Sequence, residues 1–232
     1  MLEFNIKKVK ENITRALNNR VETKVTGDNV TITAVTKNHE ITAVTEAFAS
    51  GLTNIGENRV QEAMKKRETY PNTGYWHLIG HLQRNKVKHA LKVFDIIESV
   101  DSEELLGIIN KRAAQIDKVQ DILLQINLTK EKQKTGFDYD AYKNILEKLV
   151  DYSNIQVRGL MVVGWATDNI EDNRPIFRET YNRFVELQKK LGKEQCNMLS
   201  MGMSDDYVVA IEEGANYIRL GTVLFGKRDY SK

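Results

Sequence analysis

Two stretches near the carboxyl end of the chain, Leu199-Ser-Met-Gly-Met-Ser204 and Ile218-Arg-Leu-Gly-Thr222, decide how this sequence folds. Each begins as an apolar strand and closes on glycine and hydroxyl residues, which can present backbone N–H and side-chain O–H groups to an anion. These residues are Ser200, Gly202, Ser204, Gly221 and Thr222. Together the two strand ends predict a phosphate-binding cup that needs no lysine at that point.

Outward from these two strands, the whole chain alternates short apolar runs with segments of helical periodicity. Eight strands are predicted, at 31–36, 53–56, 76–80, 94–100, 122–127, 156–163, 198–201 and 217–221. Helices are predicted between them, at 41–50, 58–68, 84–92, 102–115, 140–152, 174–191 and 205–213, with an extra amino-terminal helix at 2–19. Ser102, followed by two acidic residues, predicts a capped start for the fourth of these connecting helices.

Eight strand–helix units predict one α/β domain over residues 1–232, a (β/α)8 barrel of the TIM type. An open doubly wound sheet is the alternative, but it would need a glycine-rich turn where the chain has Thr36-Lys-Asn-His39. Barrels of this kind bind phosphate on the loops after strands seven and eight, which is where the predicted cup lies. Ring closure also brings Lys37, at the end of strand one, beside strand eight.

The composition excludes several classes of protein. With 34 basic and 32 acidic residues the net charge is +2, which argues against nucleic-acid binding driven by bulk charge. No apolar run is long enough to span a membrane, and the amino terminus lacks the apolar core of a signal peptide. The single cysteine, Cys196, excludes an internal disulfide and suits a reducing compartment. We therefore predict a cytoplasmic protein with no nucleic-acid or membrane partner. We also expect a monomer and no metal, although composition does not decide either.

Lys37 and Arg219 are the two charged residues that could act on a phosphate-bearing aldehyde. A strand-end lysine is usually a solvated surface residue, but beside the predicted cup a desolvated Lys37 amine could form a Schiff base. Arg219 could form an ion pair at the barrel rim, or it could donate to a pyridine nitrogen in the pocket. Because arginine stays protonated, that nitrogen would stay unprotonated, and the ring would be a weak electron sink.

Polar residues after the second and third strands give less specific predictions. Asn58 could bond a ring hydroxyl or, equally, cap the helix that follows it. Glu57 could orient a base or pair with Arg59. His77 and His81 lie in a strand and in the loop after it, so we expect histidines at or behind the rim rather than metal ligands.

Five motifs along the chain carry a resemblance to a known family. They are Ile55-Gly-Glu-Asn-Arg-Val-Gln-Glu62, His77-Leu-Ile-Gly-His-Leu-Gln-Arg-Asn-Lys86, Arg158-Gly-Leu-Met161, Leu199-Ser-Met-Gly-Met-Ser-Asp-Asp206 and Arg219-Leu-Gly-Thr-Val-Leu-Phe-Gly226. With these motifs in the family's order, most of the chain resembles the pyridoxal phosphate homeostasis protein family, single-domain relatives of the alanine racemase amino-terminal barrel. The motif that begins at His77 is the most specific of the five.

The resemblance implies a cofactor, pyridoxal 5′-phosphate, held as a Schiff base on Lys37. It also implies that Asn58 contacts the cofactor ring and that Arg219 faces the ring nitrogen. The residues that match the phosphate side are Ser200, Gly202, Ser204, Gly221 and Thr222. The chain departs from the family pattern at Ile55, Asn38-His39-Glu40 and Met161-Val-Val-Gly-Trp165, none of which removes a proposed contact.

By resemblance, the expected function is to bind the cofactor in vitamin B6 homeostasis, and through it to affect amino-acid and keto-acid balance, without catalytic turnover. Apoenzymes that depend on the cofactor would be transient recipients. The alternative is an amino-acid racemase or a lyase with the same cofactor. Such racemases resemble two-domain proteins with a tyrosine base in the second domain, whereas this chain stops at Lys232. A Schiff-base aldolase would carry its lysine on a later strand than the first.

Overall fold

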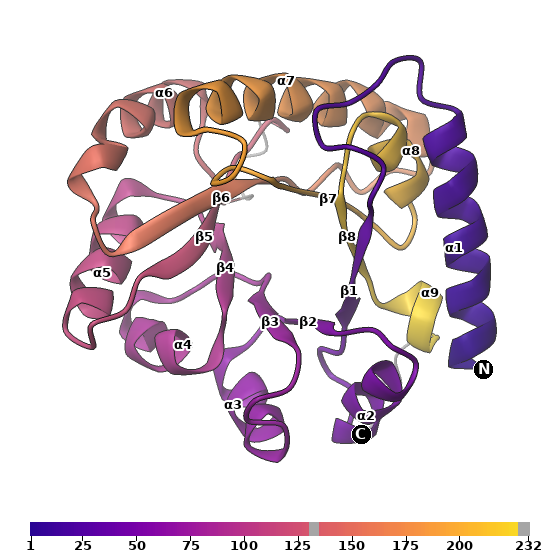
Figure 1. Cartoon of the computed structure of the whole chain (residues 1–232), viewed down its shortest axis with the longest axis horizontal. Coiled ribbons are helices and arrows are strands. Elements are labelled where there is room, and N and C mark those ends of the chain that lie inside the picture. Colours follow the sequence, from indigo (N-terminus) through magenta and orange to yellow (C-terminus); the bar gives the residue numbers. More distant parts are fainter. Residues whose placement is uncertain (130–134, 227–232) are drawn as a thin grey trace.

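Eight parallel strands close into a ring in the computed structural model, which describes residues 1–129 and 135–226. Each strand pairs with its neighbour in sequence, and β8 pairs with β1. Figure 1 shows the helices on the outside of this ring, with α1 and α9 beside the closure between β8 and β1. The predicted barrel and its extra amino-terminal helix are confirmed.

The strands lie within two residues of the predicted boundaries at every end. They are β1 (Thr31–Val35), β2 (Asn54–Glu57), β3 (Tyr75–Leu78), β4 (Ile96–Val100), β5 (Gln120–Gln125), β6 (Ile155–Met161), β7 (Met198–Met203) and β8 (Tyr217–Leu220). Most are four to six residues long, so few positions on each strand face the barrel interior, where side chains alternate with those that face the helices.

The helices also follow the predicted order. They are α1 (Leu2–Asn18), α2 (Ile41–Ala49), α3 (Val60–Thr69), α4 (Val87–Val93), α5 (Glu103–Ala114), α6 (Tyr139–Lys148), α7 (Arg174–Leu191), α8 (Tyr207–Glu212) and α9 (Thr222–Phe225), with short 3₁₀ turns η1 (Arg84–Lys86), η2 (Leu149–Asp151) and η3 (Ile170–Asn173). The Ser102 hydroxyl accepts from the Leu105 amide at 3.2 Å, which confirms the predicted cap. The sequence did not predict α9 or η3.

The buried apolar residues form two clusters, a large one and a small one. The large cluster fills the space between strands and helices, while the small cluster of Ile96, Leu123, Met161 and Met198 lies apart from it. The amino-terminal helix covers the ring closure, because Asn5 donates to the Leu224 carbonyl in α9 at 2.8 Å. Its buried residues recur at helical spacing along one face.

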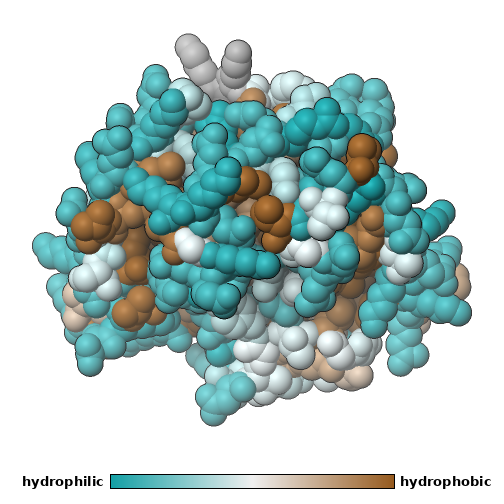
Figure 2. Space-filling view, turned by 45° about the horizontal axis from the view of Figure 1, so that its top comes forward, coloured by the Kyte–Doolittle hydropathy of each residue, from teal (hydrophilic) through white to brown (hydrophobic). Residues whose placement is uncertain are grey.

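Polar side chains dominate the outer surface. Figure 2 shows hydrophilic residues over most of one face, with apolar residues gathered in small separate groups. Within the described residues, every helix is too short or too polar to pass through a lipid bilayer.

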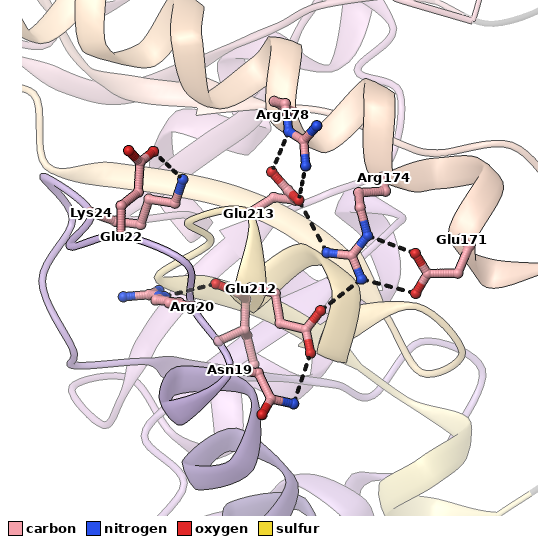
Figure 3. A network of polar contacts seen from close by, with 10 residues as sticks. Asn19, Arg20, Glu22, Lys24, Glu171, Arg174, Arg178, Glu212 and Glu213 are labelled. Atoms are coloured by element: carbon pink, nitrogen blue, oxygen red, sulfur yellow. Dashed lines mark hydrogen bonds and ion pairs between the residues drawn. The ribbon is translucent and has the colours of Figure 1, made fainter.

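A network of ion pairs holds α8 in place (Figure 3). Arg174 at the start of α7 donates to Glu212 at 2.7 Å and to Glu213 at 3.0 Å. Arg178, one turn later, donates to both oxygens of Glu213 at 2.9 and 3.0 Å. Burial alone would raise the pKa of Glu213, but the two arginines hold it below its ordinary value. The network therefore fixes the helix that follows the β7 loop.

Replacing Glu213 by glutamine should lower the free energy of unfolding by about 1–2 kcal/mol at neutral pH, because both guanidinium groups lose a charged acceptor. The pKa of Glu213 is lowered in the folded state, so its ionised carboxylate stabilises the fold above the carboxyl pKa of the unfolded chain. This stabilisation is lost as the pH falls through the folded-state pKa. Urea unfolding at pH 7 and pH 3 would measure this. Glu186→Gln, on an exposed position of α7, is the control.

Candidate functional site

The loops after β7 and β8 meet at one oxygen atom. Ser204 Oγ accepts from the backbone N–H groups of Gly221 and Val223, at 3.3 Å each. Ser204 is half-buried, and Thr222, which lies between the two donors, is exposed. Converging backbone donors of this kind form a concave site that suits an anionic oxygen. The predicted meeting of the two strand ends is therefore confirmed for these residues.

Gly202 lies where α8 packs closely on β7. Its φ is +90°, in the region that favours glycine. A Cβ at this position would lie 2.6 Å from Ala210 Cβ and 2.8 Å from Tyr207 Cα. The missing side chain thus lets α8 approach the end of β7, and the contact of Gly202 with phosphate stays a prediction.

Ser200 does not present its hydroxyl group to the cup. It is fully buried in β7, where Oγ donates to Glu98 Oε2 at 2.5 Å and accepts from Arg219 Nη1 at 2.7 Å. The sequence analysis placed Ser200 with the phosphate residues because it stands in the same motif. Both hydrogen bonds of this hydroxyl group are made inside the barrel, and its contact with phosphate stays a prediction.

These residues belong to a hydrogen-bonded chain across the barrel interior, here called the interior chain: Asn54, His77, Glu98, Ser200 and Arg219. Glu98 Oε1 lies 2.6 Å from His77 Nδ1, and His77 Nε2 lies 3.0 Å from Asn54 Oδ1. At the other end, Arg219 Nη2 donates to the Val162 carbonyl at 2.7 Å. Five strands are thereby linked through one set of polar contacts.

Burial and charge act in opposite directions on the pKa values of Glu98 and Arg219, the carboxyl and guanidinium groups of the interior chain. Glu98 is 0% exposed and Arg219 is 4% exposed. Burial would raise the pKa of Glu98, but hydrogen bonds from His77 and Ser200 and the charge of Arg219 hold it below its ordinary value. Burial lowers the pKa of Arg219, and Glu98, 3.9 Å away, opposes that change. Arg219 is thus held by the interior, not by an ion pair at the rim.

The two histidines lie in different environments. His77 is 0% exposed and belongs to the interior chain, so of the two expected positions it takes the one behind the rim. His81 lies at the rim, with its side chain 54% exposed and Nδ1 2.9 Å from Asp101 Oδ2. Within the described residues no group of histidine, cysteine and acidic side chains is arranged to hold a metal ion.

Lys37 lies two residues beyond β1, half-buried, in a turn that is fixed on both sides. On one side, Lys66 Nζ donates to the Thr36 carbonyl at 2.7 Å. On the other, the Asn38 amide donates to Glu62 Oε1 at 2.7 Å. Asn38 has φ of +59°, a conformation that asparagine tolerates better than most residues. The turn is therefore held in an uncommon conformation beside the lysine.

The side chains that hold this turn form a buried group, here called the Lys66 cluster: Glu57, Glu62 and Lys66. Lys66 Nζ lies 2.8 Å from Glu57 Oε1 and 2.7 Å from Glu62 Oε1, and Thr36 Oγ1 also donates to Glu57 Oε1 at 2.5 Å. Burial raises the pKa of Glu57 despite the Lys66 charge. Within the described chain, Glu57 Oε2 is buried without a hydrogen-bond partner. Glu57 thus pairs with Lys66, and the suggested pair with Arg59 is not formed.

Asn58 follows β2 and is half-buried. Gly80 allows β3 to end close to it, because a Cβ on Gly80 would lie 2.5 Å from the Asn58 carbonyl oxygen. The alternative that Asn58 caps the next helix is not observed: α3 begins at Val60, Arg59 is the cap residue, and no side chain makes a capping bond. Its amide remains placed at the carboxyl ends of the strands.

Lys37 and the cup lie on neighbouring strands. The register pairs Ala34 of β1 with Leu220 of β8, so both chains leave the barrel side by side. Beyond that point the rings of His39 and Phe225 lie 5.4 Å apart between centroids. The structure therefore places the end of the strand before Lys37 beside the end of the strand before Thr222, although the sequence separates them by most of its length.

Comparisons with known proteins agree with this geometry. The sequence profile of the family described as "alanine racemase, N-terminal domain" matches residues 5–229. The pyridoxal phosphate homeostasis protein of Aquifex aeolicus is 42% identical over 188 residues, which are 81% of this chain and 82% of that protein. The protein of the same name from Pasteurella multocida is 31% identical over 234 residues, which are 100% of this chain and 99% of that one.

Solved structures share the same architecture. PipY of Synechococcus elongatus, determined with pyridoxal phosphate (PLP) bound, superposes with a TM-score of 0.83 at 32% identity, covering 97% of this chain and 100% of that chain. Alanine racemase of Clostridium difficile has a TM-score of 0.70 at 16% identity and is covered over 56% of its length, a likeness of fold alone.

Proposed function

We propose that this chain binds pyridoxal 5′-phosphate and takes part in homeostasis of that cofactor, because it belongs to the pyridoxal phosphate homeostasis protein family. It also belongs to the wider alanine racemase N-terminal domain family. We further propose that it acts in the cytoplasm, as a monomer, with apoenzymes as transient recipients. The similarity to PipY, whose structure contains PLP, supports the choice of cofactor.

The observation that carries this proposal is the convergence of the Gly221 and Val223 N–H groups on Ser204 Oγ. The serine oxygen accepts from both donors, and a phosphate oxygen could take its place without moving the backbone. The exposed hydroxyl of Thr222 would add a donor. This donor set fits the phosphate group of the cofactor.

Lys37 is the residue that we assign to the covalent bond. Pyridoxal phosphate supplies an aldehyde that primary amines attack. The Lys37 amine would attach to the aldehyde carbon as one water molecule leaves, and the fixed turn would keep that amine in position. Asn58 would contact the ring from β2, and Arg219 would donate to the ring nitrogen.

Arg219 supports a role in binding the cofactor rather than in catalytic turnover. A guanidinium group does not give up its proton, so a ring nitrogen that accepts from it stays unprotonated and withdraws electrons weakly. The buried carboxylate of Glu98, which opposes the effect of burial on the pKa of Arg219, helps to keep that residue charged. We therefore propose a protein without catalytic turnover, in keeping with the name of its relatives.

An absorbance spectrum of the protein purified with its cofactor tests this function. We expect a visible band that borohydride removes, with the reduced cofactor attached to the chain. A spectrum without a cofactor band after incubation with PLP would reject the proposal. To test turnover, the loaded protein is incubated with L-alanine and analysed by chiral chromatography; accumulating D-alanine beyond one equivalent would reject the non-catalytic part.

Removing the Thr222 hydroxyl should weaken cofactor retention. A hydrogen bond to a charged partner contributes about 1.5–3 kcal/mol, so Thr222→Val should raise the dissociation constant of PLP by roughly 10- to 150-fold. Affinity for pyridoxal, which lacks the phosphate, should change little. Equilibrium dialysis measures both ligands, and Thr45→Val in α2 is the control because that exposed hydroxyl lies outside the site. Equal losses for both ligands would contradict a phosphate contact.

A further inference from the structure

A second cavity opens at the opposite mouth of the barrel, where the strands begin. Its volume is about 510 Å³, and its walls include the first residues of several strands, among them Asn54, Tyr75 and Tyr217. Asp121, near the start of β5, and Arg158, in the middle of β6, contribute opposite charges to the same cavity. Neither the cup nor Lys37 lies on its walls, so this is a separate site.

Arg158 is the feature that calls for a ligand. Its side chain is 24% exposed, and Arg158 Nε is buried without a hydrogen-bond partner in the described part of the chain. Asp121 Oδ2 lies 3.6 Å from that nitrogen, so the two side chains form an ion pair without a normal hydrogen bond. The same oxygen accepts from the Tyr75 hydroxyl at 3.0 Å. Because Nε itself is buried, a carboxylate from solution would bind at the terminal guanidinium nitrogens, on the exposed part of the side chain.

Asp121 restricts what that ligand can be. A phosphate dianion drawn to Arg158 would lie close to the Asp121 carboxylate, and the two negative charges would repel each other. A molecule with a carboxylate and a neighbouring ammonium group avoids this, since each charge meets its opposite. The tyrosine hydroxyls and the Asn54 amide around the cavity leave room for a ligand whose side chain is polar or of moderate size.

We propose that the amino-terminal mouth of this barrel binds a free α-amino acid as its zwitterion, with the carboxylate on Arg158 and the ammonium group on Asp121. An occupant would also contact Asn54, which lines the cavity and lies 3.0 Å from His77 in the interior chain. The ligand would therefore bind next to the polar contacts that end on Arg219. The binding itself does not depend on the proposed function of the other mouth.

Calorimetric titration of the full chain, freed of cofactor, tests this site with matched ligand pairs. L-alanine is compared with pyruvate and L-phenylalanine with phenylpyruvate, because each pair differs only in the group at Cα; inorganic phosphate is a third arm. At least one amino acid should bind saturably, and about tenfold more tightly than its oxo acid and than phosphate. Absence of saturable amino-acid binding, or equal binding of the oxo acid or of phosphate, would overturn the proposal. This comparison needs no variant.

Variants then locate the bound amino acid. Arg158→Met keeps the length of the side chain without its donors and should weaken amino-acid binding about tenfold or more. Arg112→Met, on the exposed face of α5, is the matched control and should bind as the parent chain does. Lys37→Ala should also leave the binding unchanged. Binding that survives Arg158→Met in a folded protein, or that disappears with Lys37→Ala, assigns the ligand elsewhere and rejects this site.

Discussion

Replacing Lys37 by alanine should abolish the covalent attachment of the cofactor. Without the amine no bond to the aldehyde carbon can form, so the visible band of the bound cofactor and the product trapped by borohydride should both be lost. Because the phosphate contacts that we propose at Ser204 and Thr222 would remain, the variant should still bind PLP, weakly and reversibly. Absorbance spectra and the intact mass after borohydride treatment measure the two effects separately.

Lys86→Ala is the matched control for this experiment. Lys86 also lies beyond the end of a strand at the same mouth, and it is half-buried like Lys37. The trapped product should be retained in full when this lysine is removed. If Lys37→Ala kept the trapped product while Lys86→Ala lost it, the assignment of the covalent bond would have to move to the β3 loop.

Replacing Lys66 by methionine should have the largest effect on stability. Methionine fills a similar volume but leaves the buried Glu57 carboxylate without its cation, a change that lowers the free energy of unfolding by about 3–5 kcal/mol. The Thr36 carbonyl also loses its donor, so the Lys37 turn should loosen. Urea unfolding at neutral pH measures the stability, and the rate of cofactor attachment reports on the turn.

The pH dependence of the stability of Lys66→Met distinguishes the loss of an ion pair from poor packing of the methionine side chain. Burial already raises the pKa of Glu57, and removal of Lys66 should raise it further. The folded variant then takes up a proton more readily than the unfolded chain, so its stability deficit should shrink as the pH falls towards the unfolded carboxyl value. Lys65→Met, at the exposed neighbouring position on α3, should leave the free energy of unfolding almost unchanged. A deficit that does not change with pH would argue against this account.

The architecture could be predicted from the sequence because its signal is local and repeated. Each strand is a short apolar run and each helix carries its own periodicity, so eight independent segments agree on one topology. Ring closure then follows from geometry, and with it the pairing of the Lys37 strand with the strand before Thr222. The cup was predicted from glycine and hydroxyl residues that stand at strand ends, where barrel ligands bind.

The barrel interior could not be predicted in the same way. Ser200 and Ser204 look alike in sequence, but only the strand pairing shows that Ser200 reaches Glu98 and Arg219 while Ser204 reaches the β8 loop. Glu98 did carry a signal, since a carboxylate inside the apolar run Ile96-Ile-Glu-Ser-Val100 must find a partner if buried. Its partner His77 belongs to another strand, and the stagger that joins them is a property of the closed ring.

The closure of β8 on β1 affects when the protein can work during its synthesis. Lys37 is synthesised long before Gly221 and Thr222. In the proposed function, a growing chain therefore carries the amine before it has the phosphate site that would select the right aldehyde. Retention of the vitamin should begin only when the first and last strands of the barrel pair, so chains that lack β8 should withdraw none of it.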